Sequence, residues 1–258
     1  MLINSVIIIL REVLEAALII SVLLAVSQKL QLSKQWLVAA LIAGLIGAAV
    51  YAINLKMVSM AFEGSGQEII NANLHLLIYG FIFFLVAILK GKPYHRLTLL
   101  AMTSCVAVAS IREGSEIIIY IHGFFAIPDL FLPVIIGSII GMGIGISVGV
   151  LFYYLIVNMS FNNGIRLVLF LLILIAGGMI IQATQLLIQA DIISSQLPLW
   201  DSSSIIDERS LFGQLLYALI GYESTPTATQ VYCYITSLIL MTFIANRTLK
   251  RFKLSHAS

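Results

Sequence analysis

The stretch Arg11-Glu12-Val13-Leu14-Glu15 lies in the middle of a long apolar run, and its pattern returns inside another apolar run in Arg112-Glu113-Gly114-Ser115-Glu116. We call these two stretches the pentapeptides. A charged side chain at the centre of a bilayer costs roughly 2.5 to 3.5 kcal/mol to insert, and such residues usually mark functional sites. The pentapeptides therefore indicate a functional site at membrane depth, and a path for a cation is the first hypothesis.

The rest of the chain is apolar enough to lie in a membrane. Of its 258 residues, 60% are hydrophobic and only 10% are charged, and the mean hydropathy is +1.07. A helix needs about 20 apolar residues to cross a bilayer. Runs close to or above this length occupy residues 2–27, 36–54, 73–89, 97–121, 131–157, 165–189 and 229–245. We therefore predict an all-α integral membrane protein with seven transmembrane helices, in a single membrane domain over residues 1–258.

The first apolar run is expected to stay in the mature protein. It has no basic leader, it is longer than the apolar region of a signal peptide, and charged residues interrupt its middle.

Charges outside the pentapeptides are divided unevenly between alternate connections of the seven runs. One set of connections carries cations and no acid: Lys29, Lys34, Lys90, Lys92, Arg96, Arg166, Arg247, Lys250, Arg251 and Lys253. The opposite set carries Lys56 and Arg209 against a majority of acids: Glu63, Glu68, Asp129, Asp191, Asp201, Asp207, Glu208 and Glu223. Because cytoplasmic loops are rich in Lys and Arg, we predict an outside N-terminus and a cytoplasmic C-terminus. The acids would then face outward. One interpretation is that they concentrate cations at the outer entrance, and the other is that they are ordinary solvated loop charges.

The position of the pentapeptides predicts an internal repeat. They fall in the first and fourth runs, so three spans separate equivalent positions and the second copy is inverted. The second run has Ala40, Gly44 and Ala48 at four-residue spacing, and the fifth run has Gly137, Gly141, Gly145 and Gly149. Such small residues let helices approach closely. We predict an inverted three-plus-three repeat with its site near the midplane, as in many secondary transporters, and one extra C-terminal helix.

Helical spacing gives each pentapeptide a face with two carboxylates. Glu12 and Glu15 are three residues apart, and Arg11 is four residues before Glu15, so these side chains are neighbours on a helix. The second pentapeptide repeats this spacing. Four carboxylates without a soft ligand nearby favour a hard cation. We predict that the acids follow one another from outside inward in the order Glu116, Glu113, Glu12, Glu15; the alternative is a set of ion pairs that serves only helix assembly.

The chain has two R-E-x-x-E motifs, in the first and fourth of its seven predicted helices, and its N-terminus is predicted to lie outside. In these features it resembles the high-affinity iron permease family, the oxidase-dependent iron transporters of fungi and bacteria. Further similar segments are Gln67-Glu68, Gly177-Gly178 with the glutamines that follow, Leu199-Trp200-Asp201 and Gly221-Tyr222. The resemblance implies ferric iron as the cargo. It also implies that iron is handled by Glu12, Glu15, Glu113 and Glu116, with Arg11 and Arg112 as their charge partners.

The same resemblance implies a set of partners. The chain is expected to act in the cell membrane with iron and lipid as its partners, and to receive iron from a separate oxidase or extracytoplasmic iron-binding protein. No other cofactor and no nucleic acid are expected. Asn71 stands where members of the family often have a second acid, which leaves Glu63 and Glu68 as an outer relay or as plain loop charges.

Other polar residues in the apolar runs have two interpretations each. Gln182, Gln185 and Gln189 share one helix face and either bond between helices or line a pore. His75 and His122 are interpreted as hydrogen-bonded or interfacial residues rather than ligands.

Two rival functions are a permease for another cation, such as manganese or lead, and a membrane-embedded lipid-phosphate hydrolase. The hydrolase would need a nucleophile or a phosphate-binding cluster near the pentapeptides, and the sequence has no Ser-His pair or Arg-dense loop there. We therefore expect a transporter and not an enzyme.

Overall fold

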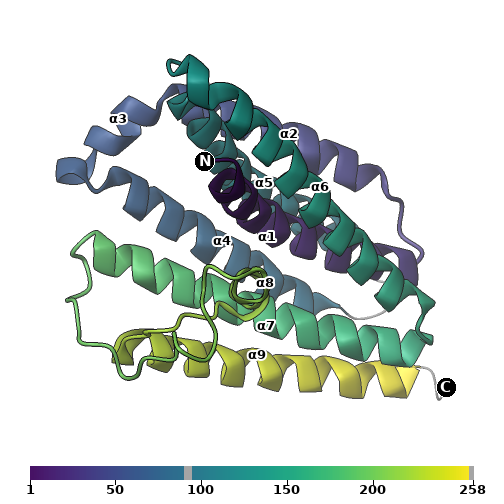
Figure 1. The fold of residues 1–258 in the computed structure, drawn as a ribbon. Helices are drawn as coiled ribbons and strands as arrows, with labels where there is room; N and C mark the ends of the chain where they lie inside the picture. Colours follow the sequence, from purple (N-terminus) through teal and green to yellow (C-terminus); the bar gives the residue numbers. More distant parts are fainter. Residues whose placement is uncertain (90–94, 256–258) are drawn as a thin grey trace.

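The chain folds as an assembly of long helices (Figure 1). A computed structural model describes residues 1–89 and 95–255. In this part of the chain the helices are α1 (Leu2–Lys29), α2 (Gln35–Ile53), α3 (Leu55–Met60), the 3-10 turn η1 (Phe62–Gly64), α4 (Gly66–Ile88), α5 (His95–Gly123), α6 (Pro128–Asn158), α7 (Phe161–Gln189), α8 (Leu211–Ile220) and α9 (Ala228–Ser255).

The predicted all-α membrane architecture is confirmed. Within the described residues, six helices are long and apolar enough to cross a membrane: α2, α4, α5, α6, α7 and α9. Helix α1 has 28 residues, which is also sufficient length, but the charges of its pentapeptide make it more polar than these six. Large apolar side chains such as Leu45 and Leu151 are exposed on the outside of α2 and α6, as expected of surfaces that face lipid. The seventh span stays a prediction.

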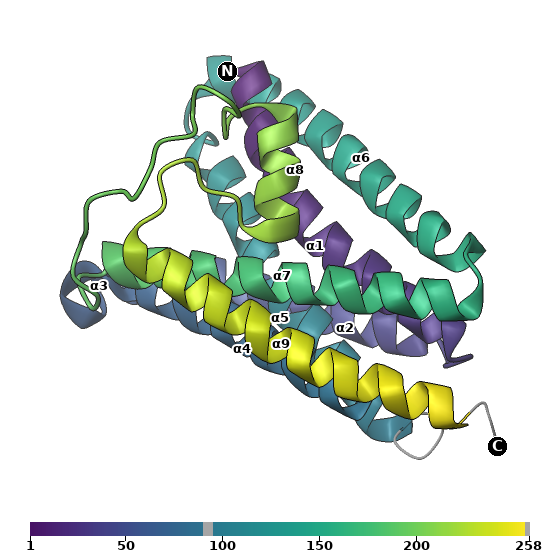
Figure 2. The ribbon, with the colours of Figure 1, turned by 90° about the horizontal axis from the view of Figure 1, so that it is seen from below.

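The long helices form matching pairs. Helix α1 packs along α6, α2 packs along α5, and α4 packs along α7, while α9 covers the other side of α7. Figures 1 and 2 show α7 and α9 side by side along one edge of the molecule. Exchanging α1 with α5, α2 with α6 and α4 with α7 leaves this set of pairs unchanged.

Small residues lie at these helix interfaces, as the sequence predicts. A Cβ atom added to Gly141 of α6 would lie 2.6 Å from the carbonyl oxygen of Val6 in α1, and one added to Gly44 of α2 would lie 2.3 Å from Cβ of Ser110 in α5. Ala40 and Ala48 are fully buried on the same side of α2. Both stripes therefore allow the backbones of the paired helices to approach each other.

The segment between α7 and α9, residues 190–227, folds back over the helices (Figure 2). Its helix α8 packs against α1 and α7, where the sequence analysis predicts only external connections. The Ser210 hydroxyl caps α8 by accepting a hydrogen bond from Gly213 N at 3.0 Å. Gly221 ends α8 with φ +66°, and its backbone crosses α7 so closely that an added Cβ would lie 2.6 Å from Cα of Gly178. Glycine is required on both sides of this crossing.

Most predicted helix bounds differ from the observed ones by a few residues. Two helices differ more. Helix α4 begins at Gly66 and not near residue 73, so Glu68 lies in its first turn, and α9 continues to Ser255 instead of ending near residue 245. Among the ten cations of the predicted cytoplasmic set, Lys90 and Lys92 lie outside the described residues, as do the side chains of Lys250, Arg251 and Lys253.

Candidate metal centre

The two pentapeptides meet where α1 and α5 pack together, and Arg112 is the residue that joins them. Its Nη1 atom lies 3.1 Å from a carboxylate oxygen of Glu15 and 3.4 Å from one of Glu12, both on α1. The same atom contacts the Glu113 carboxylate, and Nη2 lies 3.2 Å from Glu116. One buried guanidinium therefore contacts all four predicted carboxylates.

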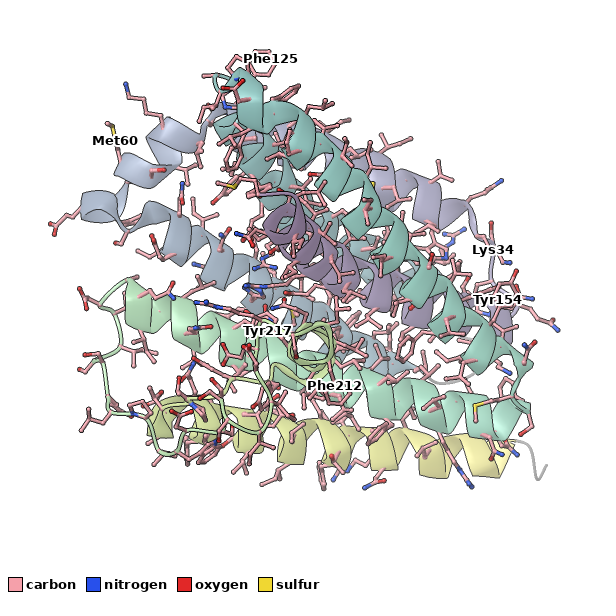
Figure 3. All side chains as sticks on the ribbon, in the orientation of Figure 1. Lys34, Met60, Phe125, Tyr154, Phe212 and Tyr217 are labelled. Carbon is pink, nitrogen blue, oxygen red and sulfur yellow. The ribbon has the colours of Figure 1, made fainter. Side chains whose placement is uncertain are left out.

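Arg11 lies at the edge of this cluster. Its Nε atom is 3.7 Å from Glu12 and 3.6 Å from Glu15, and its side chain is 35% exposed. Its Nη2 donates a hydrogen bond of 3.2 Å to the hydroxyl of Tyr217 on α8, and the guanidinium lies 4.3 Å from the centre of that ring, which suits a cation–π contact. Figure 3 labels Tyr217 near the centre of the molecule. Helix α8 thus holds Arg11, a role that the sequence analysis did not predict.

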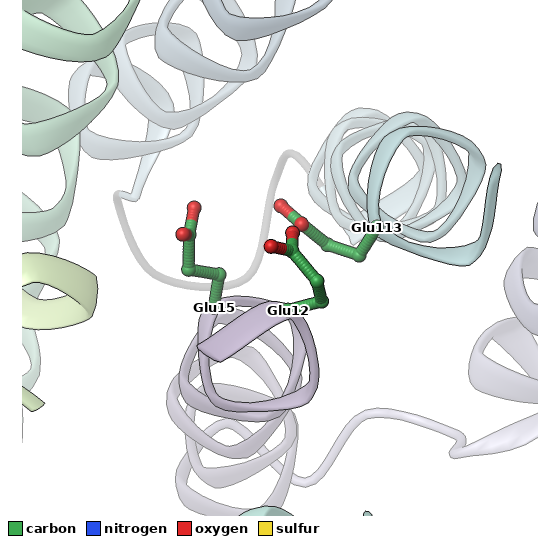
Figure 4. A group of neighbouring side chains, drawn as sticks. All are labelled: Glu12, Glu15 and Glu113. Carbon is green, nitrogen blue, oxygen red and sulfur yellow. The ribbon is translucent and has the colours of Figure 1, made fainter. Parts of the chain in front are cut away.

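Three of the four carboxylates form a compact group (Figure 4). Glu12, Glu15 and Glu113 are buried and each offers an oxygen within 4.8 Å of the others. Glu116 lies apart from this group: its side chain is 29% exposed, and it accepts a hydrogen bond of 3.3 Å from Nδ2 of Asn71. The structure therefore brings the predicted ligands together as three plus one.

The charge of the cluster leaves it able to accept a cation. Four carboxylates and the guanidinium groups of Arg11 and Arg112 give a formal charge of −4 + 2 = −2 when all are ionised. The Oε1 atoms of Glu15 and Glu113 are buried and accept no hydrogen bond within the protein, although Nε of Arg11 lies 3.6 Å from Oε1 of Glu15. Buried polar atoms without a hydrogen-bond partner are costly, and a bound metal ion would offset that cost.

A polar cavity of about 250 Å³ lies beside the cluster. Its lining comes from α1, α4, α5, α7, α8 and the connections before and after α8: Arg11, His75, Arg112, Glu116, Gln182, Gln185, Leu186, Gln189, Glu208, Gln214, Tyr217 and Glu223. The three glutamines of α7 all line this cavity, which agrees with the pore-wall interpretation of their shared face.

Comparison with known proteins identifies the family. Residues 84–250 match the Iron permease FTR1 family, in agreement with the resemblance carried by the pentapeptides. The chain belongs to this family. It is therefore a multi-pass plasma-membrane permease that transports iron, and membership of a transporter family agrees with the expectation that the chain is not an enzyme.

Curated relatives of this FTR1 family member are bacterial. The Ferrous iron permease EfeU of Yersinia pestis is 24% identical over 250 residues, which cover 89% of this chain and 88% of the relative. The protein of the same name from Yersinia pseudotuberculosis is 24% identical, with 89% and 87% covered. The one from Shigella flexneri is 23% identical over 140 residues, with 54% and 59% covered. No solved structure matches the chain significantly.

The permease's cavity also contains Glu208 and Glu223, two acids of the predicted outer set. Glu223 accepts hydrogen bonds from Nε2 of Gln185 at 3.3 Å and from Nε2 of Gln230 at 2.5 Å. Burial, and then the negative charge of Glu208, raise the pKa of Glu223 to about 7, although the bond from Gln230 acts in the opposite direction. The one-sided distribution of acids and the neighbouring Gly221-Tyr222 segment both pointed to this region from the sequence.

The predicted relay residues are farther from the centre of the permease. Glu63 is exposed in η1. Glu68 is half-buried in the first turn of α4, and its Oε2 atom makes no hydrogen bond within the protein. Tyr51 lies within electrostatic reach of both Glu68 and Glu116. A relay through Glu63 and Glu68 stays a prediction.

Proposed function

We propose that this permease carries iron into the cell through the carboxylates of the two pentapeptides. The observation that carries the proposal is the buried group of Glu12, Glu15 and Glu113, with ligand oxygens within 4.8 Å of one another. Carboxylate oxygens suit hard cations. Because the Oε1 atoms of Glu15 and Glu113 make no hydrogen bond within the protein, a metal ion can bind there without replacing one.

Arg112 is the counter-ion of this site between transport events. It contacts the carboxylates that the cation needs, and a buried charge that loses its partner is strongly destabilising. A cation that binds the remaining oxygens of these acids shares the carboxylates with the guanidinium, because the cluster has a formal charge of −2 when all its groups are ionised. The carboxylates then have a positive partner in both the empty and the loaded state.

The proposed path begins in the polar cavity. Glu116, which lines the cavity and is more exposed than the other three acids, receives the cation first. Glu113, Glu12 and Glu15 follow in that order toward the cytoplasm. The presence of Glu208 and Glu223 in the same cavity supports this direction, since both belong to the predicted outer set of acids.

The proposed topology has seven spans, with α1 as the first, an outside N-terminus and an inverted repeat of α1, α2 and α4 in α5, α6 and α7. The length of α1 and the unchanged set of helix pairs under this exchange support it. In this arrangement α1 and α5 cross between the two halves, which is where transporters with inverted repeats bind their substrates.

The proposed cargo is ferric iron, as the resemblance to the oxidase-dependent iron transporters implies, and the hard oxygen donors of the carboxylates suit such a cation. A separate oxidase or extracytoplasmic iron-binding protein would deliver it. The curated relatives are called ferrous iron permeases, which favours Fe²⁺ as the alternative cargo. Manganese and lead are further alternatives, because carboxylates also bind these cations.

Uptake by proteoliposomes tests the role of the pentapeptides. We expect the double variant Glu12→Gln, Glu113→Gln to lose nearly all iron uptake, because it removes one acid from each pentapeptide. Asp129→Asn is the matched control, since it also replaces an acid by its amide but at an exposed position in the first turn of α6, and it should transport as the wild type does. Size-exclusion profiles of all variants check folding. Undiminished uptake by the folded double variant would end the proposed mechanism.

The oxidation state is tested with the wild-type permease. Proteoliposomes are given ferric iron, or ferrous iron with and without an added oxidase. If ferric iron is the cargo, ferrous uptake should depend on the oxidase. Uptake of ferrous iron under reducing conditions without an oxidase would instead support the alternative.

A further inference from the structure

His75 is a completely buried histidine of α4, and one of its ring nitrogens has a defined partner. Its Nδ1 atom lies 2.9 Å from the backbone carbonyl oxygen of Asn71, one helical turn earlier. A carbonyl oxygen only accepts hydrogen bonds, so Nδ1 is the nitrogen that carries the proton. In the neutral ring, Nε2 then presents a lone pair. Metal-binding histidines are commonly oriented in this way, with the other nitrogen donating to a backbone carbonyl.

The Nε2 atom of His75 is buried and makes no hydrogen bond of ordinary geometry within the protein, although Gln182 lies close enough to interact with the ring. The rest of the buried face of α4 is mostly apolar, with Ala72, Ile78, Ile82 and Leu85. An apolar residue would fill such a place without leaving a polar atom unpaired. Packing alone therefore does not explain an imidazole at this position.

The neighbours of His75 in the cavity also offer unpaired ligand atoms. Gln182 of α7 lies beside His75 and is 1% exposed. Neither its amide oxygen nor its amide nitrogen makes a hydrogen bond of ordinary geometry. Glu116 lines the same cavity and is bound by the side chain of Asn71, at 3.3 Å. Asn71 thus orients the imidazole through its backbone and the carboxylate through its side chain.

We propose that Nε2 of His75, the amide oxygen of Gln182 and the carboxylate of Glu116 form an iron-binding position at the buried end of the cavity. This inference rests on the proposed function, because it places the position immediately before the group of Glu12, Glu15 and Glu113 on the same path. It also assigns His75 a task that carboxylates cannot perform. Imidazole suits iron, whereas carboxylate, carbonyl and water ligands suit Mg²⁺, Ca²⁺ and Mn²⁺, so His75 gives the path its preference for iron over manganese.

The first test is X-ray absorption of bound iron. The full-length permease, purified with a tag that contains no histidine, is loaded with substoichiometric iron in the oxidation state that the wild type takes up. We expect the outer-shell scattering of an imidazole ligand in the wild type and its loss in His75→Gln. His122→Gln is the matched control, because His122 is exposed at the end of α5, and it should retain the signal. Absence of imidazole scattering in the wild type would overturn the proposal without any variant.

The second test is competition between metals in proteoliposomes. We expect the iron concentration for half-maximal uptake to rise by about tenfold or more in His75→Gln, and the manganese concentration that halves iron uptake to fall by a similar factor. Loss of an outer-shell partner of a ligand already costs about 10- to 100-fold in affinity, and loss of the ligand should cost no less. His122→Gln should compete like the wild type. An unchanged competition curve in His75→Gln would contradict the proposal.

These results distinguish the histidine position from the proposed carboxylate path. Loss of uptake in Glu12→Gln, Glu113→Gln together with an unchanged iron spectrum in His75→Gln would keep the proposed function and remove the histidine position. Undiminished uptake in the double variant would remove the proposed path itself. The imidazole signal would still report whether iron binds His75.

Discussion

Arg112 shows how one residue couples the two pentapeptides. Its guanidinium is almost completely buried and contacts Glu12 and Glu15 on α1 as well as Glu113 and Glu116 on its own helix. A planar guanidinium can hold several carboxylates at once, which the single ammonium of a lysine does less well. The choice of arginine at this position therefore follows from the number of acids around it.

Glu223 leads to a prediction on pH dependence at the same scale. Burial, aided by the charge of Glu208, raises the pKa of this carboxyl from 4.5 to about 7. The folded permease therefore favours the protonated form more than the unfolded chain does. The contribution of protonated Glu223 to the stability of the fold is fully present below pH 4.5 and is lost as the pH rises through about 7. We expect Glu223→Gln to flatten the fall of the melting temperature between these pH values.

Thermal unfolding in detergent at a series of pH values measures this effect. Glu63→Gln removes an exposed acid and should follow the wild-type curve. Parallel curves for the wild type and Glu223→Gln would contradict the prediction.

Single residues of the site were predictable where local spacing decides their neighbours. The contacts Arg11 to Glu15 and Arg112 to Glu116 follow from positions four residues apart on a helix, and both are present. The contact of Arg112 with Glu15 depends on how α1 crosses α5, which no local pattern specifies. The lack of a hydrogen-bond partner at Nε2 of His75 was equally unpredictable, because it depends on which side chains of the surrounding helices lie next to the ring.

At the scale of elements, the contact between α1 and α6 depends on the glycine stripe of α6. A Cβ at Gly141 would lie 2.6 Å from Val6 O and 3.0 Å from Leu10 N, whereas one at Gly143 would meet nothing within 4 Å. We expect Gly141→Ala to destabilise the permease, since α1 would have to move away from α6. Gly143→Ala, the matched control, should be neutral or stabilising by up to about 1 kcal/mol, because alanine favours a helix over glycine.

Melting temperatures of both variants measure this difference, and iron uptake shows whether the displaced α1 still presents its acids to α5. Equal stability of the two alanine variants would show that the close approach of α1 and α6 is not required.

Elements were predictable where a long apolar pattern marks them. Polar residues at the start of α4, including Gln67 and Glu68, interrupt that pattern and concealed its first turns. Helix α8 has only 10 residues, so its apolar run was too short to suggest a span. Its position against α1 depends on the Gly178–Gly221 crossing, and a pair of glycines far apart in the sequence does not reveal that they touch.

At the scale of the whole molecule, the ends of the helices agree with the predicted alternation of connections. Figure 3 shows Met60 and Phe125, which follow α2 and α5, toward one end of the molecule, and Lys34 and Tyr154 toward the other. The predicted acidic connections thus share one end. Packing fixes this arrangement within the protein, whereas the direction of insertion depends on the distribution of Lys and Arg.

Labelling of single cysteines tests that direction. In a background with Cys105→Ser and Cys233→Ser, which replaces both native cysteines, we expect Asp129→Cys to react with a membrane-impermeant maleimide from outside intact cells. Lys34→Cys should react only after the membrane is opened, because the cation-rich connections are predicted to be cytoplasmic. Iron uptake by each variant confirms that the labelled protein is native. Labelling of Lys34→Cys and not of Asp129→Cys in intact cells would invert the proposed topology. The cavity with Glu208 and Glu223 would then open toward the cytoplasm, and Glu116 would be the last carboxylate on the path instead of the first.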